Sequence, residues 1–529
     1  MAKEFISISN IYGGHSAAQL FAGDSQYLQS IAVDPELPLS DAVGDRFSSG
    51  MIRPTAYQSF DGSEIDANPY WFITNPKDAK VYTVLNNGKL VSYNSSLGGA
   101  SLEATATSSV GNGAAYYNNY IYISTNTDVT RFGPLDGTPT KTDNFWTSTL
   151  GKTALTNTTY PSIRGAGTLP NHVMHVHVDN KLYIADVVDG QGVVHFIRTT
   201  KTTDEGDTND GSLFNVLDLP LNYLPTCIAS YGNDIVIGAI QTTDGVVKQG
   251  KAALFFWNTI DDSFYNIVDL PDPLVTALQM NNGTLFAWTG AVSDGANESN
   301  GYRLCVYAGG QTVQTIHYSE VGAPPLPGAV DAFGDRVIWG TFTQLQGTNA
   351  GSPEYHAVAM SYGSKNPAIP GGLHCIARST ATASASDGLV TALKYVQQES
   401  FSRPKMIMGW RDASGYGLDK SSTNYGTWYF RKAFNIGRKF TVTGVRLPLG
   451  DAVAANTTIQ AKIYTDNFSA SSTDGLTEIN NTNYPGAKYV QHFPNISGDH
   501  DFVLELKGTG SNLMPVQLPI VIEVEIEED

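Results

Sequence analysis

The stretch SLFNVLDLP, at residues 212–220, returns as SFYNIVDLP at residues 263–271, and each copy leads into the same two-strand pattern. LPTCIASYGNDIVIG follows the first copy and LVTALQMNNGTLFAW follows the second, while GAVDAFGDRVIWG at residues 328–340 is a looser relative. An internal repeat of this length predicts a fold built from equivalent units, because each unit buries its apolar face against the next one.

The most regular part of the repeat is an apolar stretch, a two-residue turn rich in Asn, Gly or Asp, and a second stretch that alternates apolar and polar residues. Such turns accept positive φ and match the twist of paired strands, so each copy predicts a β-hairpin. The second turn positions of six copies are Gly88, Asn119, Asn180, Asn233, Gly283 and Asp335. Their mean spacing of about 49 residues is close to the roughly 40–50 residues of one four-stranded propeller blade. A short first gap and a long second gap predict that one hairpin is displaced within its blade.

A seventh unit follows, because DGLVTALKYV at residues 387–396 repeats DPLVTALQM at residues 272–280, and KMIMGW at residues 405–410 supplies a returning strand. The sequence therefore predicts an all-β protein with a β-propeller of about seven blades at residues 59–424. Blades packed around an axis cover each other's apolar faces and leave only short edges. The segment YWFIT, at residues 70–74, is our candidate for a borrowed strand that closes the ring.

The two ends of the chain differ from this body. Residues 1–58 carry turn residues and scattered apolar ones without sustained periodicity, which predicts an extended N-terminal arm that lies along something else. Residues 425–529 contain longer alternating strands, which predict a jelly-roll-like β-sandwich. In the last strand, alternate residues from Ile520 to Ile526 are apolar and the opposite face carries Glu523 and Glu525, so one side is expected to be core.

Composition limits the possible functions. The chain has 32 Lys plus Arg against 50 Asp plus Glu, a net charge of −18, whereas binding to a nucleic-acid backbone needs clustered basic residues. The N-terminus MAKEFISISN has no signal pattern, and no run of about 18 apolar residues occurs, which predicts a soluble protein made in a cytoplasm. Cys227, Cys305 and Cys375 have no paired-thiol spacing, and we expect them to be buried and reduced.

The strongest metal-like cluster is NHVMHVHVD, with His172, His175 and His177. In a strand His175 and His177 share a face and His172 points away, so we expect partly buried or stacking histidines in preference to a metal site. DEGDTNDG, at residues 204–211, has the composition of a calcium loop without its ligand register, and a solvated connecting loop is the better interpretation.

Three aspartates, Asp61, Asp387 and Asp474, precede glycine as in sialidase repeats, but none continues into Gly-x-x-Trp, and turn chemistry explains them. Trp410, Arg411, Tyr416 and Trp428 either form a sugar-stacking patch or pack at a domain junction. Glycosidase action needs two carboxylates at a set separation that a sequence does not show. We therefore predict no catalytic, cofactor-binding or metal-binding residue, no cofactor and no enzymatic activity.

The opening of the chain has Gly13-Gly14, then Ser25, then IAVDP at residues 31–35 and GMIRP at residues 50–54, ahead of a propeller-like body. This layout resembles tailed-bacteriophage virion proteins, and ringed propellers of this sort resemble the nozzle proteins of short-tailed phages. The resemblance implies a structural tail protein, a nozzle or hub, that assembles in the host cytoplasm as a homo-oligomer with portal, adaptor or other tail proteins. An acidic wall would let DNA pass without sticking to it.

Two other functions stay open from the sequence. The chain could be a receptor- or glycan-binding module, such as part of a tail fibre or a surface lectin, that uses a blade loop or the sandwich. It could also be a propeller glycoside hydrolase, in which case changing one acidic residue would abolish its activity.

Overall fold

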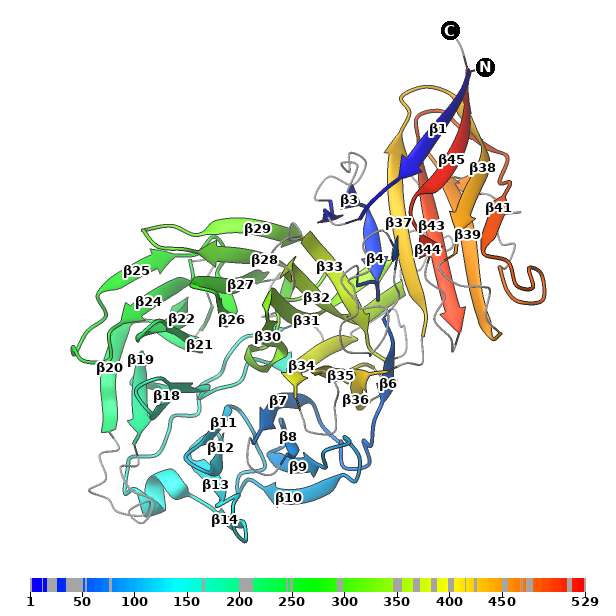
Figure 1. Cartoon of the computed structure of the whole chain (residues 1–529). Coiled ribbons are helices and arrows are strands. Elements are labelled where there is room, and N and C mark those ends of the chain that lie inside the picture. Colours follow the sequence, from blue (N-terminus) through cyan, green and yellow to red (C-terminus); the bar gives the residue numbers. More distant parts are fainter. Residues whose placement is uncertain are drawn as a thin grey trace.

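In the computed structural model, the chain forms a ring of sheets and, beside it, a pair of sheets that pack face to face (Figure 1). The structure describes residues 2–11, 13–16, 26–34, 51–52, 55–75, 79–163, 167–198, 213–243, 246–247, 251–292, 298–345, 354–364, 372–381, 388–397, 404–413, 415–422, 426–449, 455–466, 468, 470–471, 479–510 and 516–527. None of the helices within these residues has the length and apolar character needed to span a membrane.

Within the described residues, seven sheets follow one another along the chain, each with four main strands in antiparallel pairing, and we call them blades one to seven. Blades one to three contain, in turn, β7 (Pro69–Thr74), β8 (Val81–Leu85), β9 (Lys89–Tyr93) and β10 (Ser101–Thr105); β11 (Ala114–Tyr117), β12 (Tyr120–Ser124), β13 (Val129–Gly133) and β14 (Thr140–Thr142); and β17 (Met174–His177), β18 (Lys181–Val188), β19 (Gln191–Ile197) and β20 (Leu213–Leu221). Blades four and five contain β21 (Tyr223–Tyr231), β22 (Asp234–Thr243), β24 (Ala253–Trp257) and β25 (Asn266–Asp269); and β26 (Leu274–Asn281), β27 (Thr284–Val292), β28 (Glu298–Tyr307) and β29 (Gln314–Ser319). Blades six and seven contain β30 (Val330–Phe333), β31 (Asp335–Leu345), β32 (Glu354–Ser364) and β33 (Gly372–Arg378); and β34 (Leu389–Val396), β35 (Lys405–Arg411) and β36 (Tyr416–Ser421) with β6 (Tyr57–Ser59).

Short elements complete this body. β15 (Ser162–Ile163) and β16 (Gly167–Thr168) extend blade five, and β23 (Val246–Val247) pairs with β22 of blade four. A π-helix, η1 (Phe145–Thr149), lies between blades two and three, and a 3-10 helix, η2 (Pro327–Ala329), precedes blade six.

The blades form a closed β-propeller. The first strand of each blade packs against the first strand of the next, and β34 of blade seven packs against β7 of blade one. Phe72 and Val81 of blade one share a buried cluster with Ala392 and Ile407 of blade seven. The predicted wrapping of the repeats around an axis is therefore confirmed, and neighbouring blades cover each other's apolar faces.

The hairpins explain the uneven spacing of the repeat. Five of the predicted turns join the first two strands of a blade, but the turn at Gly88 joins the second and third strands of blade one, which confirms the displaced hairpin. Gly88, Asn119, Asn180 and Gly283 have the positive φ that such turns require. In the hairpins of Asn233 and Asp335 the preceding glycine, Gly232 or Gly334, takes the positive φ instead.

Blade seven is completed by a strand from the other end of the chain. β6 pairs with β36 in antiparallel register, with Tyr57 opposite Ser421 and Ser59 opposite Asp419. The prediction that residues 70–74 play this role is wrong, because they belong to β7, the innermost strand of blade one. A borrowed strand at the outer edge closes the ring without disturbing the apolar contacts near the axis.

Small residues on the second strands let neighbouring blades approach closely. Gly238, Gly340 and Gly409 occupy this position in blades four, six and seven. A Cβ at Gly340 would lie 2.6 Å from Val390 of blade seven, and one at Gly409 would lie 2.6 Å from Pro69 of blade one. The glycine at this position of the second strand is thus a packing requirement in these repeats.

The C-terminal part is a β-sandwich, as its alternation predicts. One sheet has the order β1 (Ala2–Ile8), β45 (Ile520–Ile526), β38 (Phe440–Pro448), β41 (Tyr489–His492), with β42 (Ile496–Gly498) also on β38; the other has the order β4 (Gln29–Ile31), β37 (Trp428–Asn435), β43 (Asp501–Gly510), β39 (Thr457–Thr465), β40 (Ala470–Ser471). Phe440 of one sheet and Phe502 of the other lie 5.5 Å apart between ring centres, inside a shared core. The alternate residues from Ile520 to Ile526 are buried, which confirms the predicted core face.

The N-terminal segment lies against the propeller and the sandwich wherever the structure describes it. Its described strands all pair within the molecule: β1 with β45, β4 with β37, β6 with β36, β5 (Met51–Ile52) with β44 (Val516–Gln517), and β2 (Gly14–His15) with both β33 and β3 (Gln26–Tyr27). The segment predicted to lie along something else thus lies, in these strands, along the propeller and the sandwich of its own chain, and both bodies need the strands to complete their sheets.

Ring closure predicts a sharp difference between two glycines of blade seven. Gly409→Ala should lower the free energy of unfolding by about 1–3 kcal/mol, because the added methyl overpacks the contact with Pro69. Gly415→Ala is the matched control, since a Cβ added there would meet no atom within 4 Å. Equal denaturation midpoints for the two variants would contradict close packing between blades seven and one.

Candidate functional site

The predicted histidine cluster is a link between two blades. The Nε2 of His175 and the Nδ1 of His177, both on β17, lie 2.7 Å and 2.8 Å from the Ser230 hydroxyl on β21. The Nε2 of His177 donates to the Asn233 carbonyl, 2.9 Å away. The shared face of the two rings is confirmed, and they converge on a hydroxyl group, which joins blades three and four.

The third histidine points elsewhere, as predicted. The two ring nitrogens of His172 lie 3.1 Å from the carbonyl oxygen of Asn126 and 3.2 Å from that of Ala185. Burial lowers the pKa of His175 to about 4, so this imidazole is neutral at pH 7. Within the described residues, no three His, Cys, Asp or Glu side chains are grouped as metal ligands.

A buried carboxylate behind this cluster was not found from the sequence. Asp186, on β18, lies 3.1 Å from the Nε2 of His195 and accepts backbone hydrogen bonds from Thr156 and Val187. The side chains of Asp186 and His195 are fully buried. No local sequence pattern marks Asp186, because its partners His195 and Thr156 lie on the neighbouring strand and in the segment that connects blades two and three.

Of the four residues predicted to cluster at the end of the propeller, Trp410, Arg411 and Tyr416 lie on the paired strands β35 and β36, with Arg411 opposite Tyr416, and Trp428 lies on β37. Trp410 lies on β35 against the backbone of Gly417, and Tyr416 is partly exposed on the neighbouring strand. Trp428 belongs to the sandwich, where it is buried over Gly508. The two tryptophans pack against their own sheets, which agrees with the packing interpretation and leaves no common stacking surface for Trp410 and Trp428.

The remaining candidates are turn or core residues where they are described. The Asp61 carboxylate accepts backbone hydrogen bonds from Ser63 and Ala100, and these bonds lower its pKa. Asp204–Gly211, Asp387 and Asp474 lie outside the described residues. Cys227, Cys305 and Cys375 are buried free thiols, as predicted, and burial raises the pKa of Cys227 to about 12.

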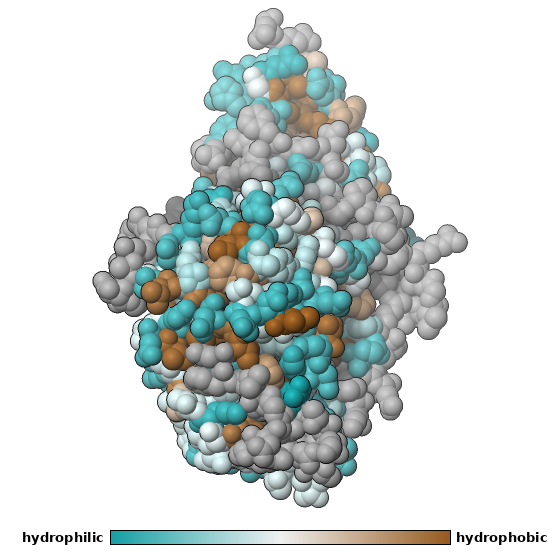
Figure 2. Space-filling view, turned by 90° about the vertical axis from the view of Figure 1, so that its left-hand side faces the viewer, coloured by the Kyte–Doolittle hydropathy of each residue, from teal (hydrophilic) through white to brown (hydrophobic). Residues whose placement is uncertain are grey.

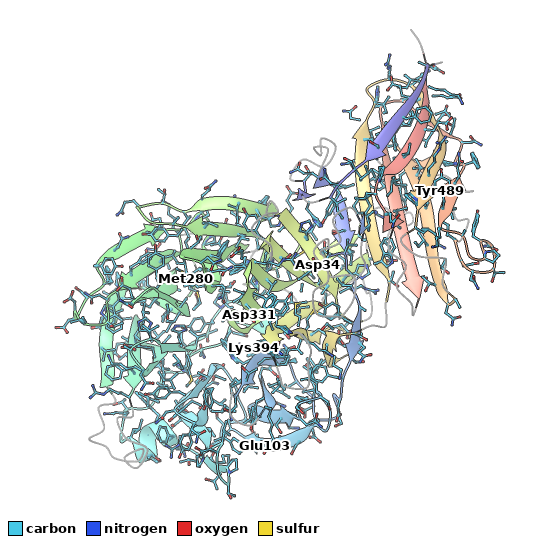
Figure 3. The ribbon with its side chains drawn as sticks, in the orientation of Figure 1. Asp34, Glu103, Met280, Asp331, Lys394 and Tyr489 are labelled. Carbon is cyan, nitrogen blue, oxygen red and sulfur yellow. The ribbon has the colours of Figure 1, made fainter. Side chains whose placement is uncertain are left out.

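The most elaborate polar arrangement lies at the junction between the propeller and the sandwich, which we call the junction site. It contains His15, Tyr27, Ser30, Asp34, Arg336 and His374, drawn from the N-terminal segment and blade six. Asp34 accepts two hydrogen bonds of 3.0 Å from the guanidinium of Arg336, and both side chains are buried. Figure 3 shows Asp34 between the two bodies.

A second group of hydrogen bonds lies near this ion pair. The hydroxyl of Tyr27 lies 2.7 Å from the Nδ1 of His374, and Ser30 donates to Tyr27 over 3.1 Å. The backbone N–H of Ser30 donates to the Nε2 of His15, whose pKa burial lowers to about 3. The Tyr27 and Ser30 hydroxyls and the Nε2 of His15 thus have partners, which is the condition for placing such groups in a core.

The sandwich side of the junction is also charged and buried. Arg431 on β37 donates from its Nε to Glu505 on β43 over 2.6 Å, and the Tyr464 hydroxyl donates to the same carboxylate. The neighbouring Lys432 donates to the backbone carbonyl of Gln26 in the N-terminal segment. Strands β4 and β3 therefore contact both bodies through paired backbone and through side chains.

No protein-family model matches the chain, and no curated protein matches it. Among solved structures, the chain is similar to the Dos1 propeller, with 12% identity, 70% of this chain and 94% of that chain covered, and a TM-score of 0.40. It is also similar to the Cps50 (Swd1) propeller domain of Myceliophteria_thermophila, with 10% identity, 70% and 100% coverage and a TM-score of 0.40. For the N-terminal domain of Nup159 the identity is 10%, the coverage 78% and 98%, and the TM-score 0.36. The propeller assignment here depends on the sheet topology, and no function is transferred from these proteins.

The junction site predicts a large effect for a single substitution. Arg336→Met should lower the free energy of unfolding by about 3–5 kcal/mol, because it leaves the Asp34 carboxylate buried without its ion-pair partner. Lys251→Met is the matched control, since it removes an exposed pair with Asp269, worth about 0–1 kcal/mol. Urea denaturation of both variants measures this difference. Similar losses of unfolding free energy would contradict the prediction that the Asp34–Arg336 pair contributes more stability than an exposed pair.

Proposed function

We propose that the protein is a structural component of a bacteriophage virion, a nozzle- or hub-like tail part that assembles into a homo-oligomeric ring with other virion proteins. One observation carries the structural part of this proposal: the N-terminal segment completes both the propeller and the sandwich. Three of its strands, β1, β4 and β6, are integral members of sheets at both ends of the molecule. A chain joined in this way transmits force between its two bodies, which suits a building part.

The virion assignment is supported by the layout of the opening residues that resembles tailed-phage proteins. The segments GG, IAVDP and GMIRP precede the propeller in that layout. In the structure, Ile31 and Asp34 of this region lie buried at the junction site. Their role in joining the two bodies is a physical reason for such a segment to stand ahead of a propeller.

A surface for neighbouring subunits is available on the rim of blades three to five. β20, β25 and β29 are the outermost strands of these blades. Near them the large side chains of Leu221, Ile260, Tyr265, Ile267 and Tyr318 are exposed, Ile260 to 85%. Figure 2 shows hydrophobic patches on this side of the molecule, between hydrophilic ones. Exposed apolar groups on free strand edges favour protein contacts.

The charge distribution does not support a DNA-guiding wall inside the propeller. Asp331 and Lys394 are the charged residues on the described innermost strands, and Figure 3 shows them close together near the axis. Asp331 accepts a hydrogen bond from the backbone N–H of Tyr395 and so links blades six and seven. The exposed carboxylates of the described residues are spread over the blades and the sandwich. Passage of DNA is therefore left out of the proposal.

Assembly is tested by mass photometry and electron microscopy of the purified full chain. We expect a discrete oligomer, and Ile267→Glu should weaken its association about tenfold or more, because a charge would replace an apolar side chain in the contact. Leu102→Glu is the matched control on blade one, since Leu102 is 45% exposed and Ile267 is 40% exposed.

A chain that stays monomeric at every concentration would contradict the ring, as would equal weakening by both substitutions. The virion assignment has its own readout: antibodies against the chain should label the tails of phage particles released from cells that carry its gene. Labelling of cell material without particles would refute that part alone.

A further inference from the structure

One face of the sandwich combines exposed aromatic rings with a polar centre. It is the outer surface of the sheet β1–β45–β38–β41, on the side away from the buried core. We call it the aromatic face, and it consists of Phe5, Arg446, Tyr489, Gln491, Phe493 and Glu523. Figure 3 shows Tyr489 on the sandwich, well away from the propeller. The opposite sheet is the one that contacts the propeller, through β4 and β33.

The strand register places these residues on one surface. Phe5 is opposite Glu523, and Arg446 is opposite Gln491. Tyr489 lies two residues from Gln491 on β41, so the period of two brings both side chains to the same side, and Phe493 follows the last residue of the strand and is exposed. Burial follows this pattern, because Val490 and His492, between them, are buried. The face is therefore continuous across four strands.

The polar centre is held by charged contacts. Glu523 accepts a hydrogen bond of 3.0 Å from Lys3, and Arg446 lies 3.6 Å from the same carboxylate. The guanidinium of Arg446 also lies over the ring of Phe5, 5.6 Å from its centroid. These contacts fix the direction of the Arg446 side chain across β45, where the side chain as a whole stays 39% exposed although its Nε is buried.

A glycine keeps the middle of the face open. A Cβ at Gly444 would meet the Gln491 amide nitrogen and a Glu523 carboxylate oxygen, each at 3.6 Å. An amide donor and a carboxylate acceptor thus flank a position that has no side chain. This is a place where a hydroxyl-bearing ligand can receive and donate hydrogen bonds at once.

The arrangement is the reverse of a usual protein interface. Protein interfaces have an apolar centre and a polar rim, whereas here Glu523, Arg446 and Gln491 occupy the centre and the aromatic rings of Phe5, Tyr489 and Phe493 lie around it. A second copy of the chain would have to bury the central charges. A ligand with both apolar faces and many hydroxyl groups meets no such cost, since its hydroxyls replace water at each polar group.

We propose that the aromatic face binds neutral oligosaccharides. The rings would stack on the apolar faces of the sugar units, and Gln491, Glu523 and Arg446 would bond their hydroxyls. Tyr489 and Phe493 are four residues apart, about 13 Å along the strand, and Phe5 lies three strands from Gln491, about 14 Å across the sheet. These spans select a ligand of several sugar units over a monosaccharide.

The charge of the face favours a neutral ligand. Two cations, Lys3 and Arg446, are matched by two carboxylates, Glu523 and Glu525, and Lys3 contacts both carboxylates. With its charges paired in this way, the face has no excess positive charge to attract sialylated or sulfated glycans. The inference does not depend on the proposed virion role, because a glycan-binding sandwich could serve a monomer or a ring.

The test is capture of the labelled full chain on an array of immobilised oligosaccharides of glucose, galactose and N-acetylglucosamine, from monosaccharides to hexasaccharides, with sialylated forms included. We expect binding to neutral oligomers that increases with length. Tyr489→Ala and Phe493→Ala should each weaken titration with the best soluble oligomer about tenfold, because a stacking surface is lost. Tyr416→Ala is the matched control on blade seven, outside both the rim and the aromatic face, 39% exposed against 51% for Tyr489, and should bind normally.

Equal thermal midpoints of all three variants would show that the fold is intact. Three results would overturn the proposal: no capture of any neutral oligosaccharide, equal loss in the Tyr416→Ala variant, or selective capture of sialylated forms. Mass photometry of the same variants adds a fourth, because conversion of an oligomer to monomers by Tyr489→Ala would identify the face as an interface between copies.

Discussion

The structure depends on the pairing of the N-terminal segment with strands that lie hundreds of residues away. β6 supplies the outer strand of blade seven, β4 and β1 supply edge strands of the two sandwich sheets, and β2 extends blade six. A sheet edge without these strands would leave a row of unpaired backbone groups. The buried Asp34–Arg336 pair fixes where the segment crosses from one body to the other, since each charge is tolerable in the core only beside its partner.

In this fold, the surfaces used for packing between blades are different from the exposed surfaces that are available to other molecules. The innermost strands and the histidine link are used for contact between blades, as the bonds from His175 and His177 to Ser230 show. The rim of blades three to five carries exposed apolar groups, and the far sheet of the sandwich carries rings around paired charges. Attachment to neighbours and recognition of a ligand can therefore occupy different bodies of one chain.

Much of the fold could be predicted because its signals are local. Hairpin turns such as those at Gly88 and Gly283 can be recognised from four consecutive residues. The alternation from Ile520 to Ile526 identifies a core face without knowledge of the strand's partners. The sharing of a face by His175 and His177 follows from strand period alone. Even the displaced hairpin of blade one was visible as uneven spacing.

The parts that could not be predicted depend on distant pairing. β4 and β6 have three residues each, too few for a periodic pattern, and their partners lie at the other end of the chain. Residues 70–74 had the composition of a closing strand, but topology places them next to the axis. Nothing local distinguishes Asp34 and Arg336 from surface charges, because their burial results from the packing of the segment between two bodies. The aromatic face was missed for the same reason, since β1 brings Phe5 beside residues from the C-terminal sheet.

Hydrogen–deuterium exchange of the full chain, followed by mass spectrometry, tests the central claim most directly. If the N-terminal segment is an integral part of both bodies, peptides covering β1, β4 and β6 will exchange as slowly as those covering β45, β37 and β36. Rapid, loop-like exchange of the N-terminal peptides beside protected blades and a protected sandwich would contradict the account.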